Sequence, residues 1–153
     1  LKKISILNFK KNVYMYMRPN MSSSYNTRAW YQTLKKSALT PPGWVFPIAW
    51  AILYAMVIAS GAVFLKTGGS VRSPGFVYYC AAWALNLLWS PLFFTYQRLT
   101  LSFIVILCLN VLIACAIREF HKVSRAASYL LVPYLAWVIF ATYLSGYIVT
   151  HNG

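Results

Sequence analysis

The sequence predicts an all-α integral membrane protein, a bundle of helices that cross a lipid bilayer. Of the 153 residues, 60% are hydrophobic and only one is acidic. A soluble domain of this composition could not cover its apolar side chains without leaving large exposed patches. Four long stretches without a charged residue follow one another between residues 37 and 153, separated by short basic segments. These observations favour a transmembrane helix bundle over a soluble fold.

Each of the four uncharged stretches has about the length of a membrane-crossing helix. They contain 29, 25, 19 and 28 residues, in residues 37–65, 73–97, 99–117 and 126–153. A helix needs about 20 mostly apolar residues to cross, because the hydrocarbon layer is about 30 Å thick and a helix rises about 1.5 Å per residue. We therefore expect four spans, over about residues 43–65, 76–96, 100–117 and 127–148.

Residues 1–28 are predicted to form a basic, disordered leader, and residues 29–153 the transmembrane domain. No uncharged stretch in the leader exceeds nine residues, so it cannot span a bilayer. Eight of the 14 Lys and Arg residues precede the first span, and such an arm could bind anionic headgroups or nucleic acid. We favour a solvated leader and expect no nucleic-acid partner. The charges near the span ends leave the membrane orientation undecided.

Proline and turn residues predict where the spans begin, bend and reverse. Residues 29–39 can form one or two turns of interfacial helix, which Pro41 and Pro42 would end. Residues 96–99 make a reversal so short that the second and third spans should be antiparallel neighbours. Pro133 predicts a kink within the last span.

The charged and sulfur-containing residues exclude most hydrolytic chemistry. Glu119 is the single carboxylic acid of the chain, and the two histidines stand alone, so no acid–base pair can be assembled. The three cysteines lie within apolar stretches, far from one another at any metal-binding spacing. We therefore exclude a hydrolase active site and expect neither a metal site nor a cofactor.

Large aromatic and small or polar residues share helix faces on three of the predicted spans. Six tryptophans are many for a chain of this length, and Trp137 is close to the middle of its span. Two interpretations remain open: the residues line a cavity for a flat apolar ligand, or they are plain helix packing with Asn86 as an interhelical hydrogen-bonding group. The shared faces contain Trp50 and Tyr54, then Asn86, Trp89 and Phe93, then Trp137, Ala141 and Ser145.

Three motifs resemble those of one known family. They are LTPPGWVFPIAWAILY at residues 39–54, WALNLLWSPLFF at 83–94 and PYLAWVIFATYLSGYIVTHN at 133–152. In this order and separation they resemble the TspO/MBR family, also called tryptophan-rich sensory proteins, translocator proteins or peripheral-type benzodiazepine receptors. The resemblance extends from about residue 30 to residue 152.

The resemblance implies a receptor or transporter-like membrane protein, often a homodimer, that binds porphyrins such as protoporphyrin IX and haem precursors, and in some members sterols. In some bacterial members, the residues that match Trp50 and Trp137 are implicated in light-dependent porphyrin degradation, so the implied alternative is an enzyme without a carboxylate pair. By motif position, the resemblance implies a ligand pocket of Tyr31, Pro41, Trp50, Tyr54, Asn86, Trp89, Phe93, Trp137, Ala141 and Ser145.

Two features depart from the family pattern. The family has five spans, and the basic leader stands where its first helix is expected, which leaves a truncated, non-functional remnant as a third hypothesis. The family's sterol signature in the last span is incomplete, because His151 stands where Lys or Arg is expected. In the absence of a recognisable eukaryotic address we expect a bacterial cell envelope membrane, or the mitochondrial outer membrane in a eukaryote.

Overall fold

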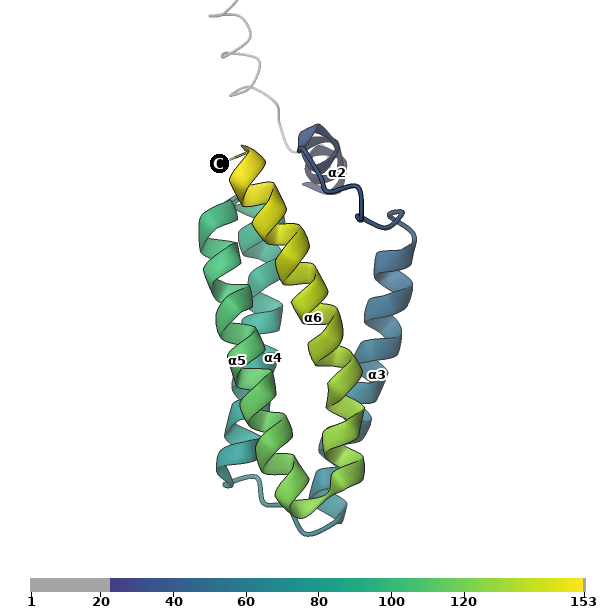
Figure 1. The fold of residues 1–153 in the computed structure, drawn as a ribbon, viewed down its shortest axis with the longest axis vertical. Helices are drawn as coiled ribbons and strands as arrows, with labels where there is room; N and C mark the ends of the chain where they lie inside the picture. The colour runs from purple at the N-terminus through teal and green to yellow at the C-terminus, as the bar shows by residue number, and fades with distance from the viewer. Residues whose placement is uncertain (1–22, 153) are drawn as a thin grey trace, which may run out of the picture. The chain divides into compact units, whose positions relative to one another are not determined.

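The computed structural model describes residues 23–152, which form five α-helices and one π-helical turn. The chain divides after Thr33 into two compact units. The first contains α2 (Ser23–Thr33), and residues 1–22 of the predicted leader lie outside the described part. The second is a helical bundle (Figure 1), made of α3 (Val45–Lys66), α4 (Pro74–Ser90), the π-helical turn η1 (Pro91–Thr95), α5 (Leu99–Val123) and α6 (Arg125–Asn152).

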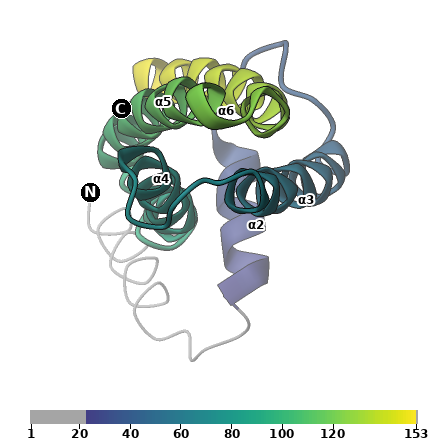
Figure 2. The ribbon, with the colours of Figure 1, turned by 90° about the horizontal axis from the view of Figure 1, so that it is seen from below.

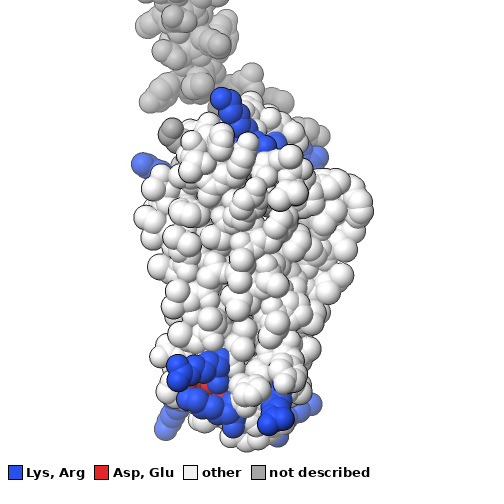
Figure 3. Space-filling model, viewed as in Figure 1, with Lys and Arg blue, Asp and Glu red and all other residues white. Residues whose placement is uncertain are grey.

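All four long segments of the bundle can cross a membrane. In the described part of the chain, α3, α4 with η1, α5 and α6 are long and apolar enough to span, as predicted. Their outer surfaces carry bare aliphatic side chains, such as Ile58 at 61% and Val111 at 62% exposure. Figure 3 shows a broad uncharged band above a basic end. Four spans of at least 22 residues are long enough to cross a hydrocarbon layer, and the protein is a multi-pass integral membrane protein.

Helices that follow one another in the chain are also neighbours around the bundle, and the first and last spans, α3 and α6, pack together to close it. α5 packs against both α4 and α6, and α3 packs against α6. The end-on view in Figure 2 shows α5 and α6 along one side, with α4 and α3 opposite them. α3 reaches α4 through aromatic side chains, for example where Phe64 stacks on Phe76 with ring centroids 6.3 Å apart. The core contains Leu109, Ile113, Phe120, Leu131 and Val138, each at most 2% exposed.

Turn chemistry at both ends of α4 explains its boundaries. Ser73 has extended backbone and its Oγ accepts a hydrogen bond from Phe76 N at 3.4 Å, which caps the helix that starts at Pro74. At the other end Pro91 has no N–H, and the helix widens so that Tyr96 N bonds Pro91 O at 2.9 Å. Gln97 then reverses the chain with φ of 53°. The predicted antiparallel pairing of the second and third spans is confirmed, since α4 packs against α5.

Three element boundaries differ from the prediction, and one of them is the end of α6, which lies at Asn152 and not near residue 148. The helix expected over residues 29–39 covers Ser23–Thr33 instead, because the serine-rich start favours a helix N-terminus. The third span was predicted to end near residue 117, but α5 continues to Val123. Its 25 residues are longer than the hydrocarbon layer requires, so the last turns reach the headgroup region, where charges are solvated. There Lys122 Nζ donates to Glu119 Oε1 at 2.7 Å and supports the helix.

Candidate functional site

An aromatic column, defined here as Phe46, Trp50, Tyr54, Trp83 and Trp137, connects α3, α4 and α6. Trp50 contacts Trp137 edge to face, with ring centroids 6.3 Å apart and planes at 86°. It also meets Tyr54 at 5.4 Å, and Tyr54 stacks on Trp83 at 5.2 Å. Phe46 packs edge-on against Trp137 at 6.1 Å. These separations lie within the range that aromatic pairs prefer, so rings from three helices form one continuous contact.

A hydrogen-bonded chain crosses the bundle beside the aromatic column. Tyr54 Oη on α3 donates to Asn86 Oδ1 on α4 at 2.7 Å. Asn86 Nδ2 in turn donates to Tyr134 Oη on α6 at 3.0 Å. Asn86 is 6% exposed and Tyr134 is 4% exposed, and a buried polar group needs such partners. The chain therefore fixes how α3, α4 and α6 are spaced at this level.

Two indole N–H groups near the hydrogen-bonded chain of Tyr54, Asn86 and Tyr134 have no acceptor in the described part of the protein. Trp137 Nε1 and Trp89 Nε1 are both buried and unpartnered. An indole nitrogen can only donate a hydrogen bond, and leaving a buried donor unsatisfied costs about 1–3 kcal/mol. A bound molecule that presents an oxygen to either nitrogen would recover this energy. Trp137 is the better candidate for donating a hydrogen bond to a bound molecule, because its ring belongs to the aromatic column.

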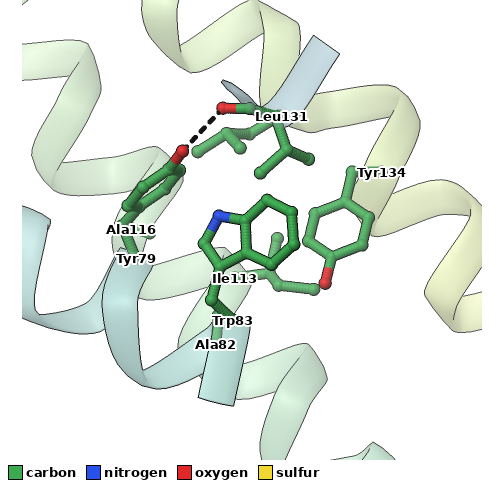
Figure 4. Close-up of a pocket in the computed structure, with 8 residues that line it drawn as sticks. Tyr79, Ala82, Trp83, Ile113, Ala116, Leu131 and Tyr134 are labelled. Atoms are coloured by element: carbon green, nitrogen blue, oxygen red, sulfur yellow. Dashed lines mark hydrogen bonds between the residues drawn. The ribbon is translucent and has the colours of Figure 1, made fainter. Parts of the chain in front are cut away.

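A small cavity lies on one side of Trp83 (Figure 4). Its volume is about 10 Å³, which is room for about one water molecule. Tyr79 Oη donates to Val57 O at 2.8 Å along its edge. Pockets for organic ligands measure about 300–1,000 Å³, so this cavity is far too small for one as it stands. It is lined by Val57, Tyr79, Ala82, Trp83, Ile113, Ala116, Leu131 and Tyr134.

The structure brings together four of the residues predicted for the ligand site. Trp50, Tyr54, Asn86 and Trp137 lie in the aromatic column or in the hydrogen-bonded chain. Their side chains converge from three helices, as the cavity interpretation requires. They also contact one another directly, through the ring pairs of Trp50 with Tyr54 and Trp137 and the hydrogen bond between Tyr54 and Asn86.

The other predicted site residues occupy four further places. Trp89 and Phe93 form a stacked pair with ring centroids 5.1 Å apart, beyond Asn86 along α4 and η1. Ala141 packs against the core and Ser145 is buried, one and two turns after Trp137 on α6. Pro41 is half-buried in the segment between α2 and α3. Tyr31 lies in α2, which belongs to the first unit of the chain, and its role stays a prediction.

Sequence reasoning missed three residues that complete this region, namely Tyr79, Trp83 and Tyr134. Trp83 stacks in the column, Tyr134 ends the hydrogen-bonded chain, and Tyr79 bonds α3 from α4. A signal was available, because Trp83 and Tyr134 each precede a predicted site residue by three positions and so share its helix face.

The arrangement can hold a flat ring system but offers no acid–base machinery. Its members supply ring faces, one amide, phenol groups and indole donors, and no carboxylate or imidazole. In the described part of the chain no group of three or more His, Cys, Asp or Glu side chains could hold a metal ion. Binding by stacking and hydrogen bonding is the chemistry that these groups support.

Comparisons with known proteins agree with the motifs. The model of the TspO/MBR family matches residues 12–150, so the match starts before the first recognised motif. A tryptophan-rich protein TspO from Chlorobaculum tepidum is 40% identical over 118 residues, covering 76% of this chain and 75% of the relative. The tryptophan-rich sensory protein of Cereibacter sphaeroides is 34% identical, with coverage of 76% and 72%. The bovine translocator protein is 34% identical, with coverage of 76% and 70%.

Proposed function

The chain belongs to the TspO/MBR family, and on this basis we propose that it is a membrane receptor or transporter-like protein for tetrapyrroles. Its ligands would be protoporphyrin IX, haem precursors and similar flat hydrophobic molecules, bound between the helices. The observation that supports this most is the aromatic column, in which rings from α3, α4 and α6 form one continuous contact and one member, Trp137, has a buried, unpartnered N–H.

The chemistry of the column suits a planar macrocycle with acidic substituents. Trp50 and Trp137 offer indole faces on which such a ring can stack. Trp137 Nε1 is a buried donor that could meet a carboxylate or carbonyl oxygen of the ligand. Both polar atoms of the Asn86 side chain already form hydrogen bonds, to Tyr54 and Tyr134. Asn86 would therefore orient the other site residues rather than bind the ligand itself.

Binding requires the column to open. The nearby cavity holds about 10 Å³, and a drug-sized ligand needs a pocket at least about thirty times larger. The contact that must separate is the edge-to-face pair of Trp50 and Trp137, because both rings are only partly buried. Separating one aromatic pair costs about 0.5–1.5 kcal/mol, which stacking on the ligand can offset.

Fluorescence titration tests this proposal. Purified protein in detergent is titrated with protoporphyrin IX in the dark, and quenching of tryptophan fluorescence is followed. We expect saturable quenching whose apparent Kd rises about tenfold in Trp50→Phe and in Trp137→Phe, since each loses an indole contact worth about 1–2 kcal/mol. Trp44→Phe is the matched control, because Trp44 is 68% exposed just before α3 and lies outside the column.

Unchanged affinity in both column variants would remove Trp50 and Trp137 from the site. Illumination of the same samples separates binding from light-dependent degradation. In the receptor, the porphyrin spectrum decays no faster than that of free porphyrin in detergent. A faster decay that disappears in the Trp50→Phe/Trp137→Phe double variant would establish the enzyme instead.

A further inference from the structure

One end of the bundle concentrates positive charge that the protein itself does not neutralise. The loop between α3 and α4 and the junction between α5 and α6 meet at this end (Figures 1 and 3). The basic end, as it is called here, carries five cations and one carboxylate, a net charge of +4. Its charged residues are Lys66, Arg72, Arg118, Lys122 and Arg125, with Glu119 as the single acid.

The one acid at the basic end is already engaged. Glu119 Oε1 accepts from Lys122 Nζ at 2.7 Å. α4 passes close to it at Gly75, where an added Cβ would lie 2.7 Å from Glu119 Cβ. Because no other Asp or Glu exists in the sequence, Lys66, Arg72, Arg118 and Arg125 have no side-chain carboxylate to pair with. Their counter-charges must come from outside the chain.

The two segments that carry the cations are held together by aromatic packing. Phe64 of α3 stacks on Phe120 of α5 with ring centroids 4.0 Å apart, and Phe76 of α4 packs on Phe64. Ser60 Oγ donates to Ala127 O at 2.6 Å and ties α3 to the start of α6. Lys66 follows Phe64 by two positions, and Arg118 and Lys122 flank Phe120. The positive charges therefore sit on a rigid base.

Apolar side chains accompany these charges and identify the class of partner. Leu65 is 40% exposed beside Lys66, Val71 is 58% exposed beside Arg72, and Val123 is 43% exposed beside Lys122. A free anion offers nothing to such side chains, whereas a phospholipid offers phosphate at headgroup level and acyl chain just below it. The end of a membrane-spanning bundle lies at that boundary.

We propose that the basic end is a binding surface for anionic phospholipids, whose phosphates neutralise Lys66, Arg72, Arg118 and Arg125. This surface lies at the opposite end of α3 from Trp50 and is independent of the tetrapyrrole proposal. Each cation near an anionic bilayer surface is worth about fivefold in affinity, so the loss of two should weaken lipid binding about thirtyfold.

Competition between lipids tests the proposal. The full chain in neutral detergent receives equal amounts of phosphatidylglycerol and phosphatidylcholine, and bound lipids are counted by native mass spectrometry. We expect phosphatidylglycerol to be enriched, and its enrichment to be lost in Arg118→Gln/Arg125→Gln and to fall with added salt. Lys35→Gln/Arg98→Gln is the matched control, because it removes two cations from the other end of the bundle and should retain the enrichment.

Three results would overturn the proposal: no enrichment in the parent, equal loss in the control pair, or displacement of phosphatidylglycerol by inorganic phosphate, which would indicate a site for free anions. Circular dichroism checks that each variant is folded. If Arg118→Gln/Arg125→Gln does not fold, Lys66→Gln/Arg72→Gln takes its place, because Lys66 and Arg72 are exposed at the end of α3 and in the following loop. Retained enrichment in this second pair would also overturn the proposal.

Discussion

At residue 61 the bundle has room for a hydrogen atom and nothing larger. A Cβ on Gly61 would lie 2.6 Å from Tyr79 Oη and 2.9 Å from Tyr79 Cζ. Tyr79 crosses over Gly61 to donate its hydroxyl to Val57 O at 2.8 Å. This glycine therefore lets a phenol from α4 bond the backbone of α3, and it keeps the two helices at the distance that the aromatic column needs.

We expect Gly61→Ala to lower the free energy of unfolding by about 1–3 kcal/mol, because the methyl group must push a tightly packed ring aside. Thermal or denaturant unfolding in detergent, followed by circular dichroism, measures the change. Gly43→Ala is the control, since a Cβ there meets nothing within 4 Å, and it should change stability by less than about 0.5 kcal/mol.

A coupling test shows whether Tyr79 is the cause. In a Tyr79→Phe background the closest atom is gone, so Gly61→Ala should cost less than it does in the parent. An equal cost in both backgrounds would mean that the clash with the Tyr79 hydroxyl is not what destabilises the variant.

Among the elements, α5 and α6 are linked by a polar contact within the membrane. Asn110 Nδ2 donates to Thr142 Oγ1 at 2.7 Å, and also to Ile106 O of its own helix at 2.9 Å. Thr142 Oγ1 in turn donates to Val138 O at 2.7 Å. Asn110 is a polar residue within an apolar span, where such groups are costly, and its partner depends on how α5 and α6 pack.

Thr142→Val should lower the free energy of unfolding by about 0.6 kcal/mol, the average for an interhelical hydrogen bond in a membrane, and by no more than about 1.7 kcal/mol. Thr150→Val is the matched control, because Thr150 bonds only within α6, to Gly146 O, Tyr147 O and the His151 ring. Unfolding in mixed micelles compares the two. If both variants lower the free energy of unfolding equally, the loss arises from removing a hydroxyl within α6 and not from breaking the link to α5.

At the scale of the whole molecule, the spans and the pairing of α4 with α5 were predictable, and the packing of α3 against α6 was not. Charged residues mark the ends of spans because they cannot stay in hydrocarbon, and α3 to α6 begin and end close to them. Trp50 and Asn86 stood out as bulky or polar groups on apolar faces. Trp83 and Tyr134 share the helix faces of Asn86 and Trp137, but the partners that they meet depend on how α3, α4 and α6 pack. The periodicity of one helix does not identify partners on another.

The segment before α3 is joined to the end of α6, across 117 positions of sequence. Asn152 Oδ1 accepts from Lys35 N at 2.9 Å, and Asn152 Nδ2 donates to Lys35 O at 3.0 Å. One side chain thus satisfies both backbone groups of Lys35. Ser37 Oγ lies 3.1 Å from Tyr143 Oη and adds a second contact between the same segment and α6. The segment carries Pro41 toward α3, so these contacts decide how firmly it is held.

Asn152→Ala should release this segment without unfolding the bundle. Each hydrogen bond contributes about 0.5–1.5 kcal/mol, so we expect the amide of Lys35 to exchange with deuterium roughly tenfold faster, while helix content stays unchanged. Exchange mass spectrometry on peptides over residues 34–44 provides the measurement.

Asn152→Asp keeps the acceptor for Lys35 N and should preserve most of the protection. His151→Ala serves as the control, since that ring contacts only its own helix. If the Lys35 amide exchanges as fast in Asn152→Asp as in Asn152→Ala, the hydrogen bond from Lys35 N to residue 152 does not hold the segment.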